Sequence, residues 1–177
     1  MKKLLFVFFL MISASQLSAQ INKGQWLAGG SVGFTVQGST NTGLGDATNI
    51  SVSPDAGYFF IHNLAGGLRL NFQVTNPKEV RAITQYVVAP FVRYYFLPAA
   101  QKVNIFADAS YGFGSYNNGY NSYSINQYSF AAGPAVFLSP NTALEFVFAY
   151  SSYGGEFTTP RFSSFGFNIG FQVHLGH

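Results

Sequence analysis

The sequence predicts an all-β protein, an eight-stranded antiparallel up-and-down transmembrane β-barrel. Three observations predict this fold. Apolar and polar residues alternate with a period of two, only 8% of the 177 residues are charged against about a quarter in a soluble domain, and long and short links alternate. The 48% of hydrophobic residues excludes a disordered chain, and the absence of cysteine excludes disulfides, a thiol nucleophile and a lipid-attachment cysteine.

The first residues have the three-part layout of a secretory signal peptide. Lys2 and Lys3 form a basic start, Leu4–Ile12 is apolar, and small and polar residues follow. The alternative, a retained membrane anchor, would need about 20 apolar residues. We therefore expect residues 1–19 to be cleaved on export and residues 20–177 to form one outer-membrane barrel domain. Without Lys2 and Lys3 the chain has seven basic and six acidic residues, so its basic character mainly reflects the export signal.

Eight segments of the remaining chain read as β-strands, and most of them are too long for ordinary globular strands. Globular strands cluster near five or six residues, whereas a strand tilted across a bilayer needs about 9 to 11. The predicted strands are 25–37, 49–61, 65–75, 84–97, 102–114, 126–138, 143–154 and 163–175.

Each strand has its own sequence signal. The first contains the glycine-rich stretch 29–33, which indicates close approach of neighbouring strands rather than a phosphate-binding loop. In the interior of each of the next four strands one charged residue stands opposite a column of apolar side chains. The sixth continues the alternation without a charge, and the seventh places a carboxylate opposite its apolar column. The eighth alternates over eleven residues, with Phe165 and Leu175 at the ends of its apolar column.

The links predict which end of the barrel faces outward. The long links are 38–48, 76–79, 115–125 and 155–162, and the short ones are 62–64, 98–100 and 139–142. Outer-membrane barrels have short periplasmic turns and longer external loops. An even strand count then places both chain termini at the periplasmic end.

The charged residues within the strands identify the lumen. Apart from the first and last position of each strand, they are Asp55, Arg69, Arg93, Asp108 and Glu145, and all five fall on the face opposite the apolar columns. A charge facing lipid would cost roughly 2 to 4 kcal/mol, so the apolar face should be the outer one. We expect these five residues to form a structural polar network that plugs the lumen. A proton or ion pathway is the alternative interpretation.

The sequence contains few residues that could carry chemistry. Its three histidines, His62, His174 and His177, fall at the predicted periplasmic end, and none has the neighbours of a hydrolytic triad or the spacing of a metal site. We expect no catalytic residue, no metal and no cofactor. Lys78 and Arg81 are an isolated basic pair, so we also expect no nucleic acid partner.

One predicted loop, residues 115–126, has a composition suited to ligand contact. It combines tyrosine and asparagine without a formal charge, and its candidate contact residues are Tyr116, Asn117, Tyr120 and Tyr123. An extracellular ligand such as a carbohydrate or protein is therefore one expectation for this loop. The alternative is that exposed loops drift toward this composition without binding anything.

The C-terminal strand carries the most specific resemblance to a known family. Asn168, Gly170, Val173 and Leu175 fit a polar-x-Gly-x-x-hydrophobic-x-hydrophobic assembly signal. The chain thus resembles small eight-stranded outer-membrane barrels of the OmpA/OmpX-like type from Gram-negative bacteria, although it ends in Gly176-His177 instead of an aromatic residue. The resemblance implies residence in the outer membrane and contact with the barrel-assembly machinery, outer-membrane lipids and lipopolysaccharide.

These observations predict a non-enzymatic integral outer-membrane barrel with a structural or surface-interaction role in adhesion or recognition. A narrow pore for passive diffusion of small solutes is the first alternative. A lipid-modifying outer-membrane enzyme and a secreted lipocalin-like barrel are two others.

Overall fold

The protein is an antiparallel barrel of eight strands, as the sequence predicts. The structure, a computed structural model, describes residues 21–37, 47–77, 81–98, 101–155 and 158–176. The strands are β1 (Trp26–Gln37), β2 (Ala47–Ile61), β3 (Leu64–Pro77), β4 (Ile83–Tyr95), β5 (Val103–Asn117), β6 (Ser122–Ser139), β7 (Thr142–Gly155) and β8 (Thr158–Leu175). Residues 1–20, which include the expected signal peptide, lie outside the described part.

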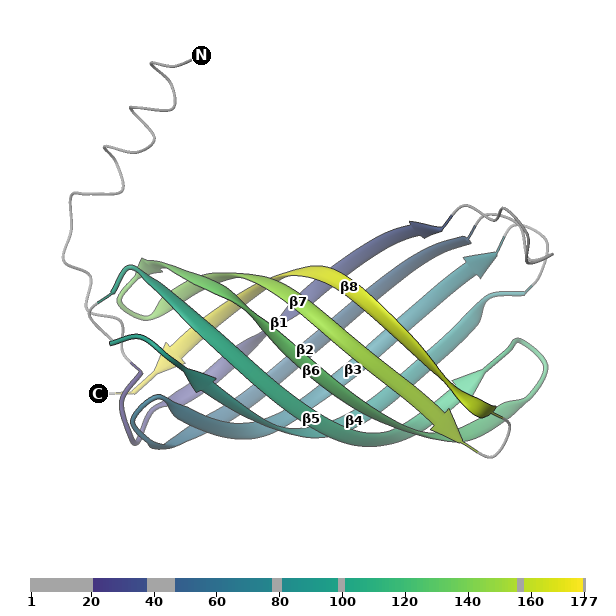
Figure 1. Ribbon diagram of the computed structural model, residues 1–177, viewed down its shortest axis with the longest axis horizontal. Helices are drawn as coiled ribbons and strands as arrows, with labels where there is room; N and C mark the ends of the chain where they lie inside the picture. Colours follow the sequence, from purple (N-terminus) through teal and green to yellow (C-terminus); the bar gives the residue numbers. More distant parts are fainter. Residues whose placement is uncertain (1–20, 38–46, 78–80, 99–100, 156–157, 177) are drawn as a thin grey trace, which may run out of the picture.

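Each strand pairs with its sequence neighbours, and β8 pairs with β1 to close the barrel. The closing ladder is short, joining Trp26–Val32 to Ile169–Leu175. Figure 1 shows β1 and β8 diverging beyond this ladder, toward the end with the long loops. We call that end the long-loop end. The opposite end, which holds the last strand residue and the tight links β2–β3 and β6–β7, is the short-turn end.

Three strand boundaries differ from the sequence prediction by three residues or more, because hairpin pairing continues past the apolar columns. β5 continues to Asn117 and β6 begins at Ser122, so most of the predicted 115–125 loop is paired strand. β8 begins at Thr158, within the predicted 155–162 loop. Once the first pairs of a hairpin form, polar residues can extend the ladder without any apolar face.

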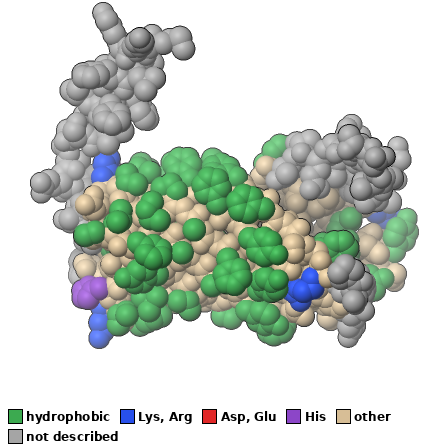
Figure 2. All heavy atoms as spheres, viewed as in Figure 1, with side chains coloured by type: hydrophobic (Ala, Val, Ile, Leu, Met, Phe, Trp, Pro, Cys, Tyr) green, Lys and Arg blue, Asp and Glu red, His purple; other side chains and the backbone are tan. Residues whose placement is uncertain are grey.

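The apolar columns face outward. Along β4 exposed and buried residues alternate at each position, with Val88, Val92 and Tyr94 exposed and Ala89, Phe91 and Arg93 buried. Figure 2 shows the result on one face of the barrel as a broad area of hydrophobic side chains, with basic side chains only near its two ends in this view. A soluble barrel would bury these columns, whereas a barrel in lipid exposes them.

Glycines allow neighbouring strands to approach closely. A Cβ at Gly112 of β5 would lie 2.5 Å from the carbonyl oxygen of Val88 on β4. Gly30 of β1 has φ +152° and leaves no room for a Cβ beside Pro54 on β2, whose Cα would be 2.7 Å away. Gly30 belongs to the glycine-rich stretch 29–33, for which the sequence predicts close strand approach.

The residues before β1 cover the short-turn end of the lumen. The carbonyl of Ile21 accepts a hydrogen bond from the N–H of Asn63 in the β2–β3 turn, and the N–H of Gly24 donates to the carbonyl of Phe59. These bonds hold the fully buried side chain of Ile21 against the apolar residues that fill the lumen near the short-turn end.

Candidate functional site

The charged residues of the strands converge in the middle of the lumen. Antiparallel register places Asp55 directly opposite Arg69 on β2 and β3, and Arg93 directly opposite Asp108 on β4 and β5. Directly opposed residues on one face lie within reach of each other. Glu145 enters from β7, and all five residues are at most 9% exposed.

Asp108 is the centre of this charged network. Its Oδ2 accepts hydrogen bonds from Nη2 of Arg69 at 2.9 Å and from Nη2 of Arg93 at 2.8 Å. Arg69 also donates to Asp55 at 3.1 Å. Arg93 donates through Nη1 to both oxygens of Glu145, at 3.0 and 3.1 Å. The network thereby joins strands on opposite sides of the barrel through charge-assisted hydrogen bonds.

Neutral residues complete the hydrogen bonding of the carboxylates. The hydroxyl of Tyr95 donates to Glu145 at 3.1 Å, and Nε2 of Gln172 on β8 donates to Asp55 at 3.0 Å. The guanidinium groups also lie over aromatic rings, Arg69 over Phe91 at 4.8 Å and Arg93 over Phe106 at 4.6 Å. Sequence alternation places Gln172 and Tyr95 on the lumen face, but their partners depend on the barrel's curvature.

An aromatic layer fills the lumen on the short-turn side of the network. The ring of His174 lies edge-on to Phe59, Tyr95 and Phe137, with centroids 5.4, 5.8 and 5.5 Å apart. Phe106 packs against Tyr95 at 6.2 Å. All five side chains are fully buried.

On the other side of the network the lumen is lined by uncharged polar residues. Gln85 donates to Gln127 across the lumen at 3.1 Å, and the hydroxyls of Ser151 and Ser129 are 3.0 Å apart. A small apolar group, Val87, Ala89 and Ile125, interrupts this polar lining, and Tyr116 packs against it.

Comparison with known proteins identifies the family. The family model described as "Outer membrane protein beta-barrel domain" matches residues 4–172. The chain belongs to this family. It is therefore an integral barrel of the outer membrane, which agrees with the outward-facing apolar belt. The comparison with curated proteins gave no significant match.

Two solved outer-membrane barrels share the family fold. Neisserial surface protein A is 17% identical with a TM-score of 0.60, and the match covers 85% of this chain and 97% of that one. The N-terminal barrel domain of OprF from Pseudomonas aeruginosa is 10% identical with a TM-score of 0.54, covering 87% and 98%. At these identities the likeness supports the fold of the family and nothing finer.

The tyrosines of the predicted recognition loop separate in space. Tyr116 and Tyr123 are opposed on the lumen side of the β5–β6 hairpin, and Tyr116 stacks on Tyr153 of β7 at 6.2 Å. Tyr120 lies in the turn itself and is 69% exposed, with the guanidinium of Arg81 4.9 Å from its ring centroid. Asn117 closes the turn, because its Oδ1 accepts from the N–H of Gly119 at 2.7 Å.

The residues of the predicted assembly signal lie on both faces of β8. Asn168 and Gly170 face the lumen, where Gly170 leaves room for Glu145, while Val173 and Leu175 face outward. Gly170, Val173 and Leu175 are within the ladder that closes the barrel on β1, and Asn168 lies just beyond it.

Sequence reasoning missed Arg161, which is an outward-facing cation at the long-loop end. It falls in the predicted 155–162 loop, whereas the structure places it in β8. The signal was present, because Arg161 has the same parity as the outward Phe165 and Phe167. Tyr153, which stacks on Tyr116, was not singled out from the sequence either, although it lies in the predicted strand 143–154 and has the parity of the inward Glu145.

The described residues hold no group of three His, Cys, Asp or Glu side chains that could bind a metal. His62 is exposed in the β2–β3 turn beside Asn22, whereas His174 is enclosed by the aromatic layer. Every carboxylate of the network accepts hydrogen bonds from an arginine, and Asp55 and Glu145 also accept from Gln172 and Tyr95, so each buried carboxylate has a partner.

Proposed function

We propose that this outer-membrane barrel is non-enzymatic, that its lumen is closed by side chains, and that it has a structural role combined with surface recognition at the long-loop end. In this proposal the short-turn end faces the periplasm and the barrel-assembly machinery inserts the chain. Residues 1–19 are then removed during export, which N-terminal sequencing of the mature protein would test through a start at Gln20.

The observation that carries the closed lumen is the charged network lying directly against the aromatic layer. Arg93 is 2% exposed and Tyr95, whose hydroxyl reaches Glu145, belongs to both layers. An eight-stranded barrel has an interior just wide enough for side chains. An ion crossing it would have to break several charge-assisted hydrogen bonds and displace rings at once.

Conductance in planar bilayers tests this closure. We expect wild-type protein to give no stable conductance steps, under conditions where a sixteen-stranded porin gives large ones. Folding and insertion are verified independently by heat-dependent migration on gels. A stable conductance of the wild type that changes in Arg93→Met would overturn the proposal in favour of a narrow pore through the network.

Recognition by the β5–β6 hairpin is supported by Tyr120 and its setting. The ring is exposed at the tip of the hairpin, and Asn118 holds the turn by accepting from the N–H groups of Tyr120 and Asn121 at 3.0 and 2.8 Å. A rigid exposed aromatic ring loses little conformational entropy on binding. Binding of cells to immobilised glycans and host proteins should fall in Tyr120→Ala and not in Tyr86→Ala, a tyrosine of the outward-facing belt.

Orientation can be tested because the chain has no cysteine. We expect Tyr120→Cys to react with a membrane-impermeant maleimide on intact cells. The matched control, His62→Cys in the β2–β3 turn, should react only after the outer membrane is permeabilised. The opposite labelling pattern would contradict the proposed orientation.

A further inference from the structure

On the outer wall formed by β6, β7 and β8, the outward-facing residues change from apolar to polar toward the long-loop end. On all three strands the outward residues close to that end are polar or glycine, and they include Asn126, Ser152 and Arg161. Next come the rings of Tyr128 on β6 and Tyr150 on β7, 6.4 Å apart, and then phenylalanines. The hydroxyl of Tyr150 bonds Ser163 on β8 at 3.0 Å. Tyrosines at such a boundary mark the level of the lipid headgroups.

The guanidinium of Arg161 is fixed at this boundary. It donates through Nη1 to Oδ1 of Asn126 at 2.6 Å, and through Nη2 to the carbonyls of Asn126 and Ser152 at 3.2 and 2.9 Å. Nε donates to the hydroxyl of Ser152 at 3.3 Å, and the group lies 5.0 Å from the Tyr128 ring centroid. Gly154 leaves room for the side chain of Arg161, because a Cβ at Gly154 would lie only 2.9 Å from Cγ of Arg161.

These contacts orient the charge of Arg161 without neutralising it. Every acceptor is a neutral oxygen, and within the described residues no carboxylate forms an ion pair with Arg161. An exposed, oriented guanidinium at headgroup level is a site for a phosphate oxygen.

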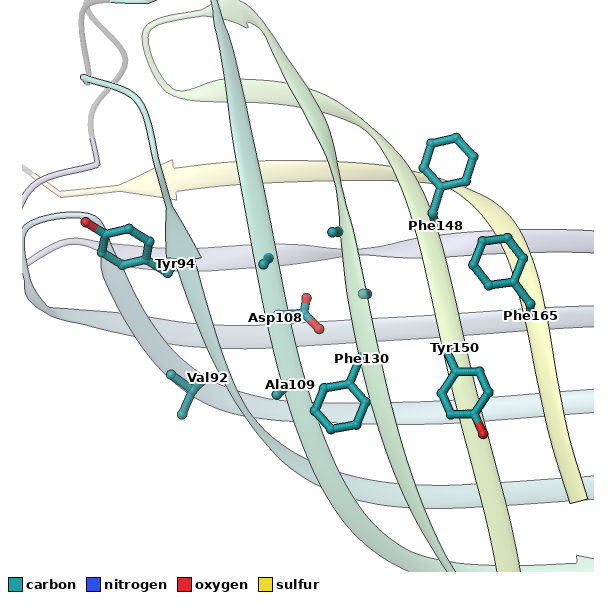
Figure 3. Close-up of a pocket in the computed structure, with 11 residues that line it drawn as sticks. Val92, Tyr94, Asp108, Ala109, Phe130, Phe148, Tyr150 and Phe165 are labelled. Carbon is teal, nitrogen blue, oxygen red and sulfur yellow. The ribbon is translucent and has the colours of Figure 1, made fainter. Parts of the chain in front are cut away.

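Two grooves run along the wall below this cation. The larger, about 540 Å³, has a floor of alanines that includes Ala109 and Ala132 and walls that include Tyr150 and Phe165. Figure 3 shows the large side chains around it, with Phe130 between β5 and β7. The second, about 460 Å³, lies beside the first and runs along Tyr128. Ala109 and Phe130 line both grooves.

We propose that this wall binds one molecule of lipid A, with a phosphate on Arg161 and acyl chains in the two grooves that share Phe130. The two adjacent grooves offer apolar surface for more than one chain, and the rings of Tyr128 and Tyr150, which line them, lie beside the cation. The choice of lipid A rests on the proposed orientation, which places the long-loop end at the outer leaflet.

Native mass spectrometry of the detergent-solubilised full chain tests the site with three probes: bisphosphorylated lipid A, its dephosphorylated form, and phosphatidylglycerol. We expect wild type to bind bisphosphorylated lipid A about fivefold to tenfold more tightly than either other probe. Arg161→Gln should remove that preference. Arg81→Gln, which changes the cation beside Tyr120 at the same end, should keep it.

A second pair of variants tests the grooves. Ala109→Phe fills the floor shared by both grooves and should weaken lipid A binding, whereas Ala56→Phe, on the outward face of β2, should not. Heat-dependent migration verifies that each variant is folded. Equal binding of the dephosphorylated lipid or of phosphatidylglycerol, equal effects of the two arginine variants, or equal effects of the two alanine variants would overturn the site. Binding in detergent does not depend on orientation in the cell, so cysteine labelling can fail independently.

Discussion

Replacing Arg93 by methionine is the sharpest perturbation of the charged network. The side chain is 2% exposed and joins Asp108 to Glu145, with contacts of 2.8 and 3.0 Å. Methionine keeps much of the length and apolar contact of the arginine stem but removes the charge and every donor. Two buried carboxylates then lose a cationic partner, and Arg69 remains as the only cation of the network.

The expected loss follows from breaking a buried ion pair on one side. Such changes lower the free energy of unfolding by about 3 to 5 kcal/mol, because the remaining charge stays desolvated. Changing Glu145 to glutamine as well removes one of the orphaned charges. We therefore expect Arg93→Met/Glu145→Gln to be more stable than Arg93→Met alone, with a coupling of roughly 0.5 to 3 kcal/mol.

Urea unfolding in lipid vesicles measures these differences, with the fluorescence of Trp26 as the probe, since it is the one tryptophan of the chain. Arg81→Met serves as the matched control, because this exposed arginine contacts only the β5–β6 turn in the described structure. The reasoning would be refuted if Arg93→Met lowered stability by no more than Arg81→Met, or if the double variant were no more stable than the single one.

Three further predictions follow from particular contacts. Gly133→Ala should lower stability by about 1 to 3 kcal/mol in the same unfolding assay, because its Cβ would collide with backbone atoms of β7, while Gly166→Ala, with nothing within 4 Å, should not. Tyr95→Phe should lower stability by about 1 to 2 kcal/mol through loss of its hydrogen bond to buried Glu145; no change would mean that the bond is not needed. Trp26 is 57% exposed on the outer face near the short-turn end, so lipids brominated close to the headgroup should quench its fluorescence more than lipids brominated near the chain ends. Equal quenching by the two kinds of lipid would show that Trp26 does not lie at the level of the headgroups.

Most of the fold could be predicted from the sequence, because every strand of the barrel follows the same alternation of outward and inward residues. The period of two in β3, β7 and β8 determines which residues share a face, and the position of Arg69 or Glu145 on that face shows which face is the lumen. The strand ends could not be predicted in the same way. Residues 115–117 and 122–125 have no apolar column, and they are strands only because their hairpin partners continue the ladder.

The residues of the polar network could be predicted from the alternation along each strand, but the hydrogen bonds between them could not. The sequence predicts that Arg93 faces the lumen with Asp108 and Glu145. It does not predict that Asp108 receives both arginines while Gln172 turns to Asp55, because those contacts cross strands that are far apart in the chain. They depend on the radius of the closed barrel and on its register.

The sequence alone thus determined the strand number, the two faces and the scarcity of charge in the belt, since each of these follows from which neighbours alternate along the chain. Only the tertiary structure decided that Arg161 lies over Tyr128 beside two apolar grooves, and that β1 and β8 close the barrel over a short ladder. Alternation is a local property of an extended backbone. Closure and the contacts between distant strands depend on curvature, which no single strand specifies.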